Sequence, residues 1–352
     1  MWAEFQDTGS LYVFQTRQWL EGWYEAVGRH RGVRPCLAAV YDDDDSPSLF
    51  FPFQIEESGR LRTLVWFGGE LIDYGAPVIG PGRVDMIAAW MEVLSRIPPV
   101  DLVRLPRIPE TINNDENPML ALECREYHSR AHYVELEGEW EEFYQGHAGS
   151  KTRSTDRRKE RRLRDLGTVE VLAGVPGEDP VFDEIALATA SQKSERYRVM
   201  RAPDIMERDG VRDFFEKPAA PLRDGGILHL SAVSLDGELI TTHWGMRFGD
   251  RFYYYMPSYA EGTWMKYSPG RLLLFQLFEW CFDNGVKFFD FTIGDESYKK
   301  DWCDREIKLY NYIEGLTAGG KAAAAAHRAG SVLLANRAVL GAARRIRKLF
   351  HS

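Results

Sequence analysis

The feature that most constrains the fold is a run of apolar segments between residues 227 and 257. Asp236-Gly237 and Gly249-Asp250 divide this run, and tight turns of this type join antiparallel neighbours. The sequence therefore predicts three consecutive strands, which are ILHLSAVSL (227–235), ELITTHWGMRF (238–248) and RFYYYMP (251–257).

A buried helix and a further strand follow. RLLLFQLFEWCFDN (271–284) is apolar nearly all round, which predicts a helix covered on most sides. The phenylalanines of FFDFTIG (288–294) fill a pleated, buried surface, and a cluster of ionisable residues comes directly after them, at 295–300. Because α/β proteins often place their chemistry where a buried strand ends, we expect a functional site here.

Composition excludes some classes of protein. A chain of 352 residues favours two domains over one, and its net charge of −9 argues against DNA as a partner. The four cysteines show no zinc-site spacing, so we expect reduced thiols and no metal. The first ten residues do not resemble a signal peptide, and no apolar run reaches the roughly 18–20 residues that span a bilayer. We therefore expect a cytoplasmic protein.

A Pro-Gly-Arg motif occurs twice in comparable surroundings. GPGR (80–83) and SPGR (268–271) each precede a predicted helix and then a strand. Asp101 follows the first arginine by 18 residues and Asp290 follows the second by 19. We expect a duplicated module, although Pro-Gly before a helix is also common turn chemistry.

The second motif has the properties of a phosphate site. The helix after Pro269 begins with unpaired backbone N–H groups, and the helix dipole adds positive potential there. We expect a pyrophosphate on the backbone of Ser268, Gly270 and Leu272, near Lys266 and Arg271. Tyr255, on the preceding strand, would line the path of the attached arm. The alternative is an ordinary helix start.

A strand, a phosphate-binding loop, a buried helix and a strand ending in ionisable residues are the layout of GNAT-type acyltransferases. The run from His243 to Trp302 resembles the GNAT-like acetyltransferases associated with bacterial cellulose and exopolysaccharide synthesis, the CelD/BcsL family, which are distant relatives of the Fem peptidyltransferases. The similar stretches are FQTRQWLEGW (14–23), DYGAP (73–77), RRKERRL (157–163), THW (242–244), YYY (253–255), YSPGRLLL (267–274) and FDFTIGDESYKKDW (289–302).

The resemblance implies an α/β (α+β) fold of two tandem GNAT-like domains with mixed central sheets flanked by helices. We expect an N-terminal domain at 1–135, an acyl-CoA-binding domain at 136–318 and a basic tail at 319–352. The loop at 267–272 has one glycine, whereas the usual signature Gln/Arg-x-x-Gly-x-Gly/Ala has more. The expected donor is therefore acetyl-CoA or another acyl-CoA.

Acyl transfer needs a base for the nucleophile, donors for the oxyanion and an acid for the leaving thiolate. His243 is either that base or a core histidine, and Asp290 is either its orienting partner or a buried structural acceptor. Glu296 is the alternative base and Tyr298 the candidate acid. Lys299 either holds a phosphate or carboxylate or is solvated.

A basic segment precedes these strands. KTRSTDRRKERRLR (151–164) carries eight Lys or Arg and two acids, and it should form a helix with Arg157 and Arg161 on one face. This face is either solvated or binds phosphate on the substrate.

We therefore predict an acyltransferase that moves an acyl group from CoA to an amine or hydroxyl of a sugar or polysaccharide precursor. One alternative is a Fem-like transferase that uses aminoacyl-tRNA, and another is a non-catalytic GNAT-fold partner of a polysaccharide synthase complex. The sequence leaves open the acceptor, the acyl chain and the oligomeric state.

The tail is Ala-rich and basic, with seven Lys or Arg and no acid between residues 321 and 352. From Ala335 to Phe350 an apolar stripe lies opposite a basic one on a helical wheel. This pattern predicts a C-terminal amphipathic helix. The helix lies either on the inner face of an anionic membrane, beside a synthase complex, or on the protein's own acidic surface.

Overall fold

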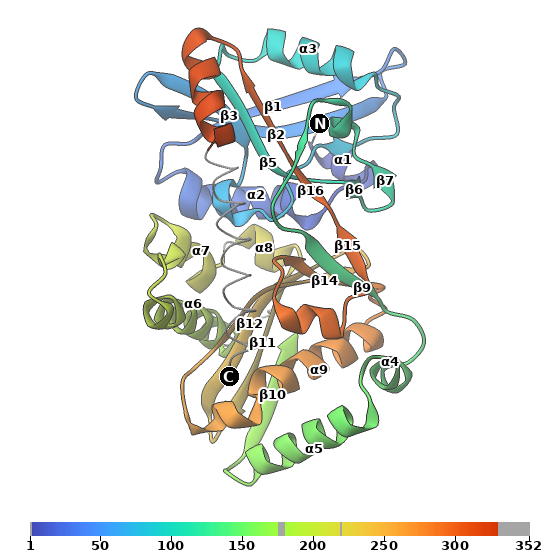
Figure 1. Cartoon of the computed structure of the whole chain (residues 1–352), viewed down its shortest axis with the longest axis vertical. Helices are drawn as coiled ribbons and strands as arrows, with labels where there is room; N and C mark the ends of the chain where they lie inside the picture. The colour runs from blue at the N-terminus through green and yellow to red at the C-terminus, as the bar shows by residue number, and fades with distance from the viewer. Residues whose placement is uncertain (1, 175–179, 219, 330–352) are drawn as a thin grey trace. The chain divides into compact units, whose positions relative to one another are not determined.

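The computed structural model describes residues 2–174, 180–218 and 220–329. They form two compact units, each built around a seven-stranded sheet (Figure 1). Each unit is assembled from separate stretches of chain: unit 1 from residues 2–10, 34–128 and 308–329, and unit 2 from residues 11–33 and 129–307. The continuous domains drawn from the sequence stay a prediction.

Unit 1 has a mixed sheet with the strand order β1-β2-β3-β5-β16-β8, and β4 pairs with β2. Its strands are β1 (Arg34–Tyr41), β2 (Pro47–Ser58), β3 (Leu61–Trp66), β4 (Val78–Ile79), β5 (Leu102–Pro109), β8 (Arg125–Glu126) and β16 (Leu309–Gly315), with a separate hairpin of β6 (Thr111–Ile112) and β7 (Asp115–Glu116). Its helices include α1 (Trp2–Thr8), α3 (Met86–Arg96) and two 3-10 turns, η3 (Gly69–Leu71) and η4 (Pro118–Ala121), and residues 318–329 are also helical.

Unit 2 has the strand order β10-β11-β12-β13-β14-β9-β15. Its strands are β9 (Ala131–Glu135), β10 (Val169–Gly174), β11 (Leu228–Leu235), β12 (Glu238–Phe248), β13 (Arg251–Tyr259), β14 (Phe288–Ile293) and β15 (Arg305–Ile307). Its helices are α2 (Arg17–Trp23), α4 (Trp140–His147), α5 (Ser150–Arg164), α6 (Val181–Met200), α7 (Val211–Glu216), α8 (Ala220–Asp224) and α9 (Pro269–Asp283), with short turns η1 (Val13–Gln15), η2 (Tyr24–Gly28), η5 (Ile205–Glu207), η6 (Thr263–Tyr267) and η7 (Ser297–Asp301).

The two sheets share one topology. In unit 1 three antiparallel strands lead to a parallel pair, β3 and β5, and β16 then pairs antiparallel with β5. In unit 2 the strands β11, β12 and β13 lead to the parallel pair of β13 and β14, and β9 pairs antiparallel with β14. α3 and α9 connect the parallel strands, as expected from the repeated Pro-Gly-Arg motif. This correspondence supports a duplicated module.

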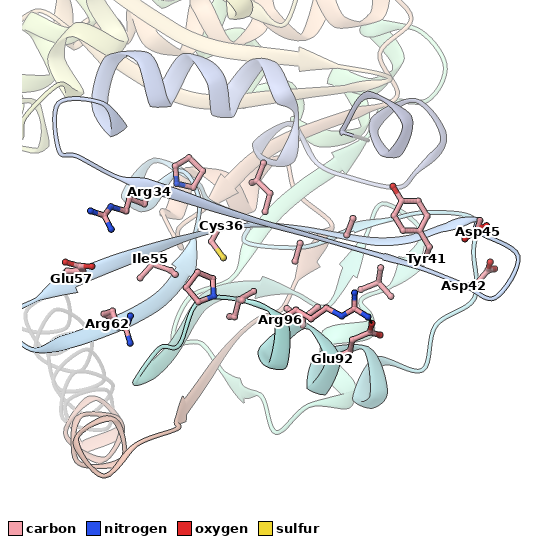
Figure 2. Close-up of a pocket in the computed structure, with 18 residues that line it drawn as sticks. Arg34, Cys36, Tyr41, Asp42, Asp45, Ile55, Glu57, Arg62, Glu92 and Arg96 are labelled. Carbon is pink, nitrogen blue, oxygen red and sulfur yellow. Dashed lines mark ion pairs between the residues drawn. The ribbon is translucent and has the colours of Figure 1, made fainter.

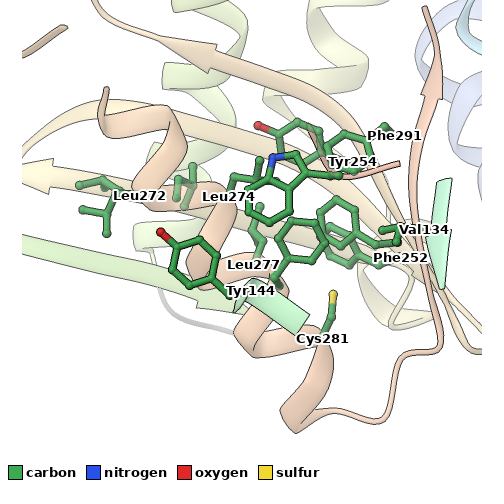
Figure 3. Packing of buried hydrophobic residues seen from close by; sticks show 14 of the residues in the cluster. Val134, Tyr144, Phe252, Tyr254, Leu272, Leu274, Leu277, Cys281 and Phe291 are labelled. Atoms are coloured by element: carbon green, nitrogen blue, oxygen red, sulfur yellow. The ribbon is translucent and has the colours of Figure 1, made fainter. Parts of the chain in front are cut away.

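Helix α9 covers one face of the unit 2 sheet. Its apolar residues, among them Leu274, Leu277 and Cys281, pack against Phe252 and Phe291 of the strands beneath (Figure 3). The sequence pattern required this position, because a helix that is apolar nearly all round must be covered on most sides.

The other face of the same sheet packs against α2 and α7. The ring of Trp19 lies 5.2 Å from Phe214, 6.0 Å from Trp244 and 5.6 Å from Tyr255, between ring centroids. Residues of β13 therefore alternate between two cores: Phe252 and Tyr254 face α9, and Tyr255 faces α2.

Most of the expected elements are present, but short ones were missed. In unit 2, α7, α8, β9 and β10 were not predicted from the sequence. The amphipathic helix expected between Ala335 and Phe350 lies outside the described residues. In the part of the chain that the structure describes, no helix has the length and apolar character needed to cross a bilayer.

Candidate active site

The parallel strands β13 and β14 separate soon after they meet. They pair over three positions, Arg251 with Phe288, Phe252 with Phe289 and Tyr253 with Asp290. Beyond Tyr253, β13 continues to Tyr259 while its pairing on this side ends. A strand edge without a ladder partner offers backbone groups to an extended ligand.

Helix α9 begins near the far end of this unpaired stretch of β13, because Gly270 lies close to Thr241, which is opposite Tyr259. Ser268 adopts a left-handed conformation with φ of 56°, Pro269 occupies the first turn, and no side chain caps the helix. A Cβ added to Gly270 would meet only the Thr241 hydroxyl oxygen, at 3.8 Å. The backbone of this turn can therefore be approached closely. The N–H groups of Arg271 and Leu272 already bond the Ser268 carbonyl, at 2.9 and 3.4 Å, so it is the Gly270 N–H and the helix dipole that favour an anion here.

The corresponding helix of unit 1 has a different start. At α3 the Asp85 carboxylate accepts hydrogen bonds from the N–H groups of Ile87 (3.0 Å) and Ala88 (3.2 Å). A carboxylate of the protein thus occupies the position of an anion at α3. The two units differ at this point, and only α9 of these two helices keeps its first turn uncapped.

Helix α5 brings two charged side chains to the start of α9. Lys159 Nζ donates to Ser268 Oγ at 2.9 Å, and Arg271 makes a two-pronged pair with Asp156 at 2.9 and 3.1 Å. A small cavity of about 20 Å³ lies among these side chains. Tyr144 donates to the same Asp156 at 2.8 Å. The pKa of the Tyr144 hydroxyl is raised mainly by burial and further by this hydrogen bond. Sequence reasoning missed Lys159 and Asp156, which lie 109 and 115 residues from their partners.

The remaining residues expected at the donor site are placed as follows. Lys266 is exposed, with its ammonium 5.0 Å from the ring centre of Tyr267. Leu272 is buried in the α9 core, and Tyr255 lies half-buried in the aromatic cluster on the opposite face of the sheet. Of this group, Ser268, Gly270 and Arg271 lie together at the start of α9.

Asp290 is paired with Arg251. Arg251 Nη1 donates to Asp290 Oδ2 at 3.1 Å, and the other carboxylate oxygen accepts from the N–H of Thr292 at 2.8 Å. Thr292 has φ of 55°, and the register of β14 shifts at this point. Asp290 therefore links β14 to the neighbouring strand β13 and also stabilises the irregular part of β14 at Thr292.

His243 is completely buried. Its ring stacks on Tyr254 with centroids 4.5 Å apart, and Nδ1 lies 3.5 Å from the Ser231 hydroxyl oxygen. Nε2 has no hydrogen-bond partner among the described residues. Burial lowers the pKa of His243 well below its ordinary value, and the neighbouring His229 lowers it further.

Of the two alternatives for Asp290, the one in which it orients His243 does not agree with the structure. His243 contacts Phe252 and Tyr254, which face α9, whereas Asp290 is in register with Tyr253, whose side chain faces the other way. The two side chains therefore lie on opposite faces of the sheet. A strand alternates its side chains between faces, so neighbouring strands do not bring every polar pair together.

The loop after β14 gathers three of the candidates. Glu296 pairs with Lys299 at 3.0 Å, and Lys299 also donates to the carbonyl oxygens of Thr292 (3.4 Å) and Ile293 (3.1 Å). Lys299 is 3% exposed, so it is neither solvated nor available as a loose surface cation. Tyr298 is partly exposed, and burial raises the pKa of its hydroxyl.

Helix α6 adds a lysine that sequence reasoning missed. Burial lowers the pKa of Lys193, while the Glu296 carboxylate acts in the opposite direction. One residue earlier, Gln192 bonds the carbonyl of Leu239 (2.8 Å) and accepts from the Thr242 hydroxyl (3.0 Å), which fixes this part of α6 against β12.

The outer face of α5 is exposed and basic. Arg157 and Arg161 have no side-chain ion pair with any described residue. Two other arginines of α5 are engaged: Arg153 bonds the Ala148 carbonyl at the end of α4, and Arg164 pairs with Glu160 at 3.0 Å.

Comparison with known proteins identifies this architecture. Residues 150–300 match a family model described as an acetyltransferase (GNAT) domain, and this range contains α5, α9 and β14. Unit 2 has a GNAT fold. A search of curated proteins found no match.

Solved structures show the same fold over most of the chain. FemX is 11% identical, covers 87% of this chain and 94% of its own, and has a TM-score of 0.56. A protein of unknown function from Bacteroides thetaiotaomicron is 11% identical, covers 83% of this chain and 88% of its own, with a TM-score of 0.52. At this identity the likeness shows fold alone. Together with the repeated sheet topology, it confirms the expected tandem GNAT-like architecture.

Proposed function

We propose that the protein is an acyltransferase that takes an acyl group from CoA and transfers it to an amine or hydroxyl of a sugar or polysaccharide precursor. One observation carries the proposal: the uncapped start of α9 lies near Thr241, opposite Tyr259, at the far end of the stretch of β13 that has parted from β14, within the range matched as a GNAT domain. The resemblance to the CelD/BcsL family motivates the choice of acceptor.

In this proposal the CoA pyrophosphate binds the backbone of Ser268 to Leu272, and Lys159 and Arg271 supply positive charge. The pantetheine arm runs along the edge of β13 beyond Tyr253, which places the thioester near the loop after β14. Unit 1 is less suited to the donor, because Asp85 already occupies the start of α3.

The chemistry is assigned to the loop after β14. Glu296 accepts the proton of the attacking amine or hydroxyl as its lone pair forms a bond to the thioester carbon. When the C–S bond breaks, Tyr298, whose phenol is protonated at neutral pH, donates its proton to the sulfur. His243 and Asp290 support the sheet rather than the reaction, because both are fully buried. Arg157 and Arg161 face solvent on α5 and would bind an anionic acceptor.

The test is incubation with a panel of acyl-CoAs and amino sugars, following thermal stability, free CoA and acylated product by mass spectrometry. We expect stabilisation by acyl-CoA and release of CoA that depends on the acceptor. Stabilisation without release would favour the non-catalytic partner of a synthase complex.

A Fem-like transfer from aminoacyl-tRNA is the second candidate, because the exposed cations of α5 also suit RNA. That activity predicts no stabilisation by acyl-CoA and binding of charged tRNA that weakens steeply with added salt. The same assay with aminoacyl-tRNA in place of acyl-CoA separates the two.

The basic tail suggests attachment to an anionic membrane beside a synthase. Truncation should follow Ala329, because Ala324 is 3% exposed and Arg328 bonds the Ile313 carbonyl at 2.7 Å. Anionic vesicles should sediment the full chain and not the truncated one, with less binding at high salt. Equal sedimentation of the two would remove the membrane from the proposal.

A further inference from the structure

Strand β1 leaves one edge of the unit 1 sheet open. It pairs with β2 on one side, and no described strand pairs with its other side. A groove of about 910 Å³ runs along it from Arg34 to Asp42 and separates it from Glu92 and Arg96 of α3 (Figure 2). The edge is therefore accessible within unit 1.

The direction of its backbone groups follows from β2. The Pro52 carbonyl accepts from the Phe67 N–H at 2.8 Å, so the backbone groups of Pro52 point away from β1. Leu37 is opposite Pro52, so it belongs to a pair that exchanges no hydrogen bonds with β2. By alternation the N–H and C=O groups of Leu37 and Ala39 point outward from the sheet, with the carbonyl of Pro35.

The charges at the two ends of β1 are opposite. Arg34 at its start has no ion pair with a described residue, and the turn after Tyr41 contains the four acids Asp42 to Asp45. A strand with this polarity is complementary to an antiparallel copy of itself. A parallel neighbour would instead place like charges side by side.

We propose that two copies of this chain associate through antiparallel pairing of their β1 strands about a two-fold axis at Ala38. In this register Leu37 of each copy exchanges both backbone hydrogen bonds with Ala39 of the other. Arg34 of each copy reaches the acidic turn of the other. The pairing extends one sheet across both molecules and is isologous, as expected of a two-fold dimer. The proposal is independent of the acyl-transfer reaction.

Cross-linking tests the register. In a Cys36→Ala background, Ala38→Cys places two thiols directly opposite each other in a pair without hydrogen bonds, where Cα atoms are about 4.5 Å apart. Ala39→Cys is the matched control, because its two copies are offset along the strands beyond disulfide reach. Under mild oxidation we expect a covalent dimer from Ala38→Cys alone; equal cross-linking of both variants would reject the register.

Association is measured by size-exclusion chromatography with light scattering over a range of protein concentrations. Ala39→Pro removes an outward N–H and no bond to β2, so it should yield a monomer, and Arg34→Asp should weaken association in a salt-dependent way. A wild-type chain that stays monomeric at every concentration, with no cross-linking of Ala38→Cys, overturns the proposal and leaves the edge to a different partner.

Discussion

Arg251 and Asp290 form a buried ion pair, 3.1 Å between donor and acceptor, that joins the first position of the β13–β14 register to the last. Their side chains are 6% and 0% exposed. The guanidinium of Arg251 also lies against the rings of Tyr12, Tyr133 and Phe288, 4.7–5.4 Å from their centres. The pair thus fixes the two strands immediately before they diverge.

Removing the arginine should destabilise unit 2. Arg251→Met leaves the Asp290 carboxylate buried without its cation, and loss of one partner of a buried pair costs about 3–5 kcal/mol. Urea denaturation measures the change. The control is Arg305→Met, because Arg305 is 55% exposed and lies 3.8 Å from Glu135, where about 0–1 kcal/mol is expected. Similar small losses in both variants would contradict the assigned role.

Gly270→Val should abolish donor binding while the protein stays folded. The added side chain has room, since its Cβ meets only the Thr241 hydroxyl oxygen at 3.8 Å, but it occupies the approach to the helix start. We expect loss of the thermal stabilisation by acyl-CoA. Gly146→Val is the control, because an added Cβ there contacts nothing within 4 Å and the residue lies on α4. If Gly270→Val binds acyl-CoA with wild-type affinity, the donor does not bind at this loop.

Lys159→Met should weaken acyl-CoA binding by about tenfold, the effect of losing one hydrogen bond to a charged group. Lys159 bonds Ser268 at the start of α9, whereas its exposed neighbour Arg158 makes no hydrogen bond to a described residue there. Arg158→Met is therefore the matched control. Isothermal titration measures the acyl-CoA affinity of both variants. Equal losses of affinity would indicate that the overall positive charge of α5, and not the specific contact of Lys159, supports binding.

Glu296→Gln should lower turnover by about 10²–10⁴-fold and leave acyl-CoA affinity nearly unchanged, because a positioned base acts on the chemical step. Tyr298→Phe should also reduce turnover. Single-turnover release of CoA gives the rate and titration gives the affinity. Glu261→Gln, at an exposed position just after β13, serves as control. Unchanged rates in both Glu296→Gln and Tyr298→Phe would assign the acid and base to other residues.

Buried histidines should make stability depend on pH. Burial lowers the pKa of His229 to about 3 and that of His243 well below its ordinary value. In the unfolded chain these histidines take up a proton near pH 6.5, whereas in the folded protein they stay neutral. Their contribution to the free energy of unfolding is therefore complete above that pH, and below it falls by about 1.4 kcal/mol per pH unit for each histidine. His243→Phe should remove the contribution of one histidine from this pH dependence, as measured by urea denaturation. The exposed His128→Gln should leave the slope unaltered.

The local elements of the site could be predicted because short-range patterns encode them. The apolar circumference of α9 and the phenylalanines of β14 identified a buried helix and strand, and Pro269 marked the helix start. The partners of the charged residues could not be predicted. Whether Asp290 meets His243 or Arg251 depends on which sheet face each occupies, and a register shift near Trp244 in β12 alters that alternation.

Contacts distant in sequence were equally inaccessible. The arginines on one face of the basic segment were expected either to be solvated or to bind phosphate, but the side chains that reach α9 are Asp156 and Lys159, on the face that packs. Helical spacing places residues on a face without stating which neighbour that face meets.

The shared sheet topology has a consequence for synthesis of the chain. The sheet of unit 1 receives β16 next to β5, although more than 190 residues separate Leu309 from Pro109. The sheet of unit 2 receives β9, which is made before its other strands. On the ribosome, therefore, unit 1 is the first to begin its strands and the last to have all of them synthesised. Unit 2 can close its sheet as soon as residue 307 has emerged, whereas the edge of β5 waits for the segment that follows.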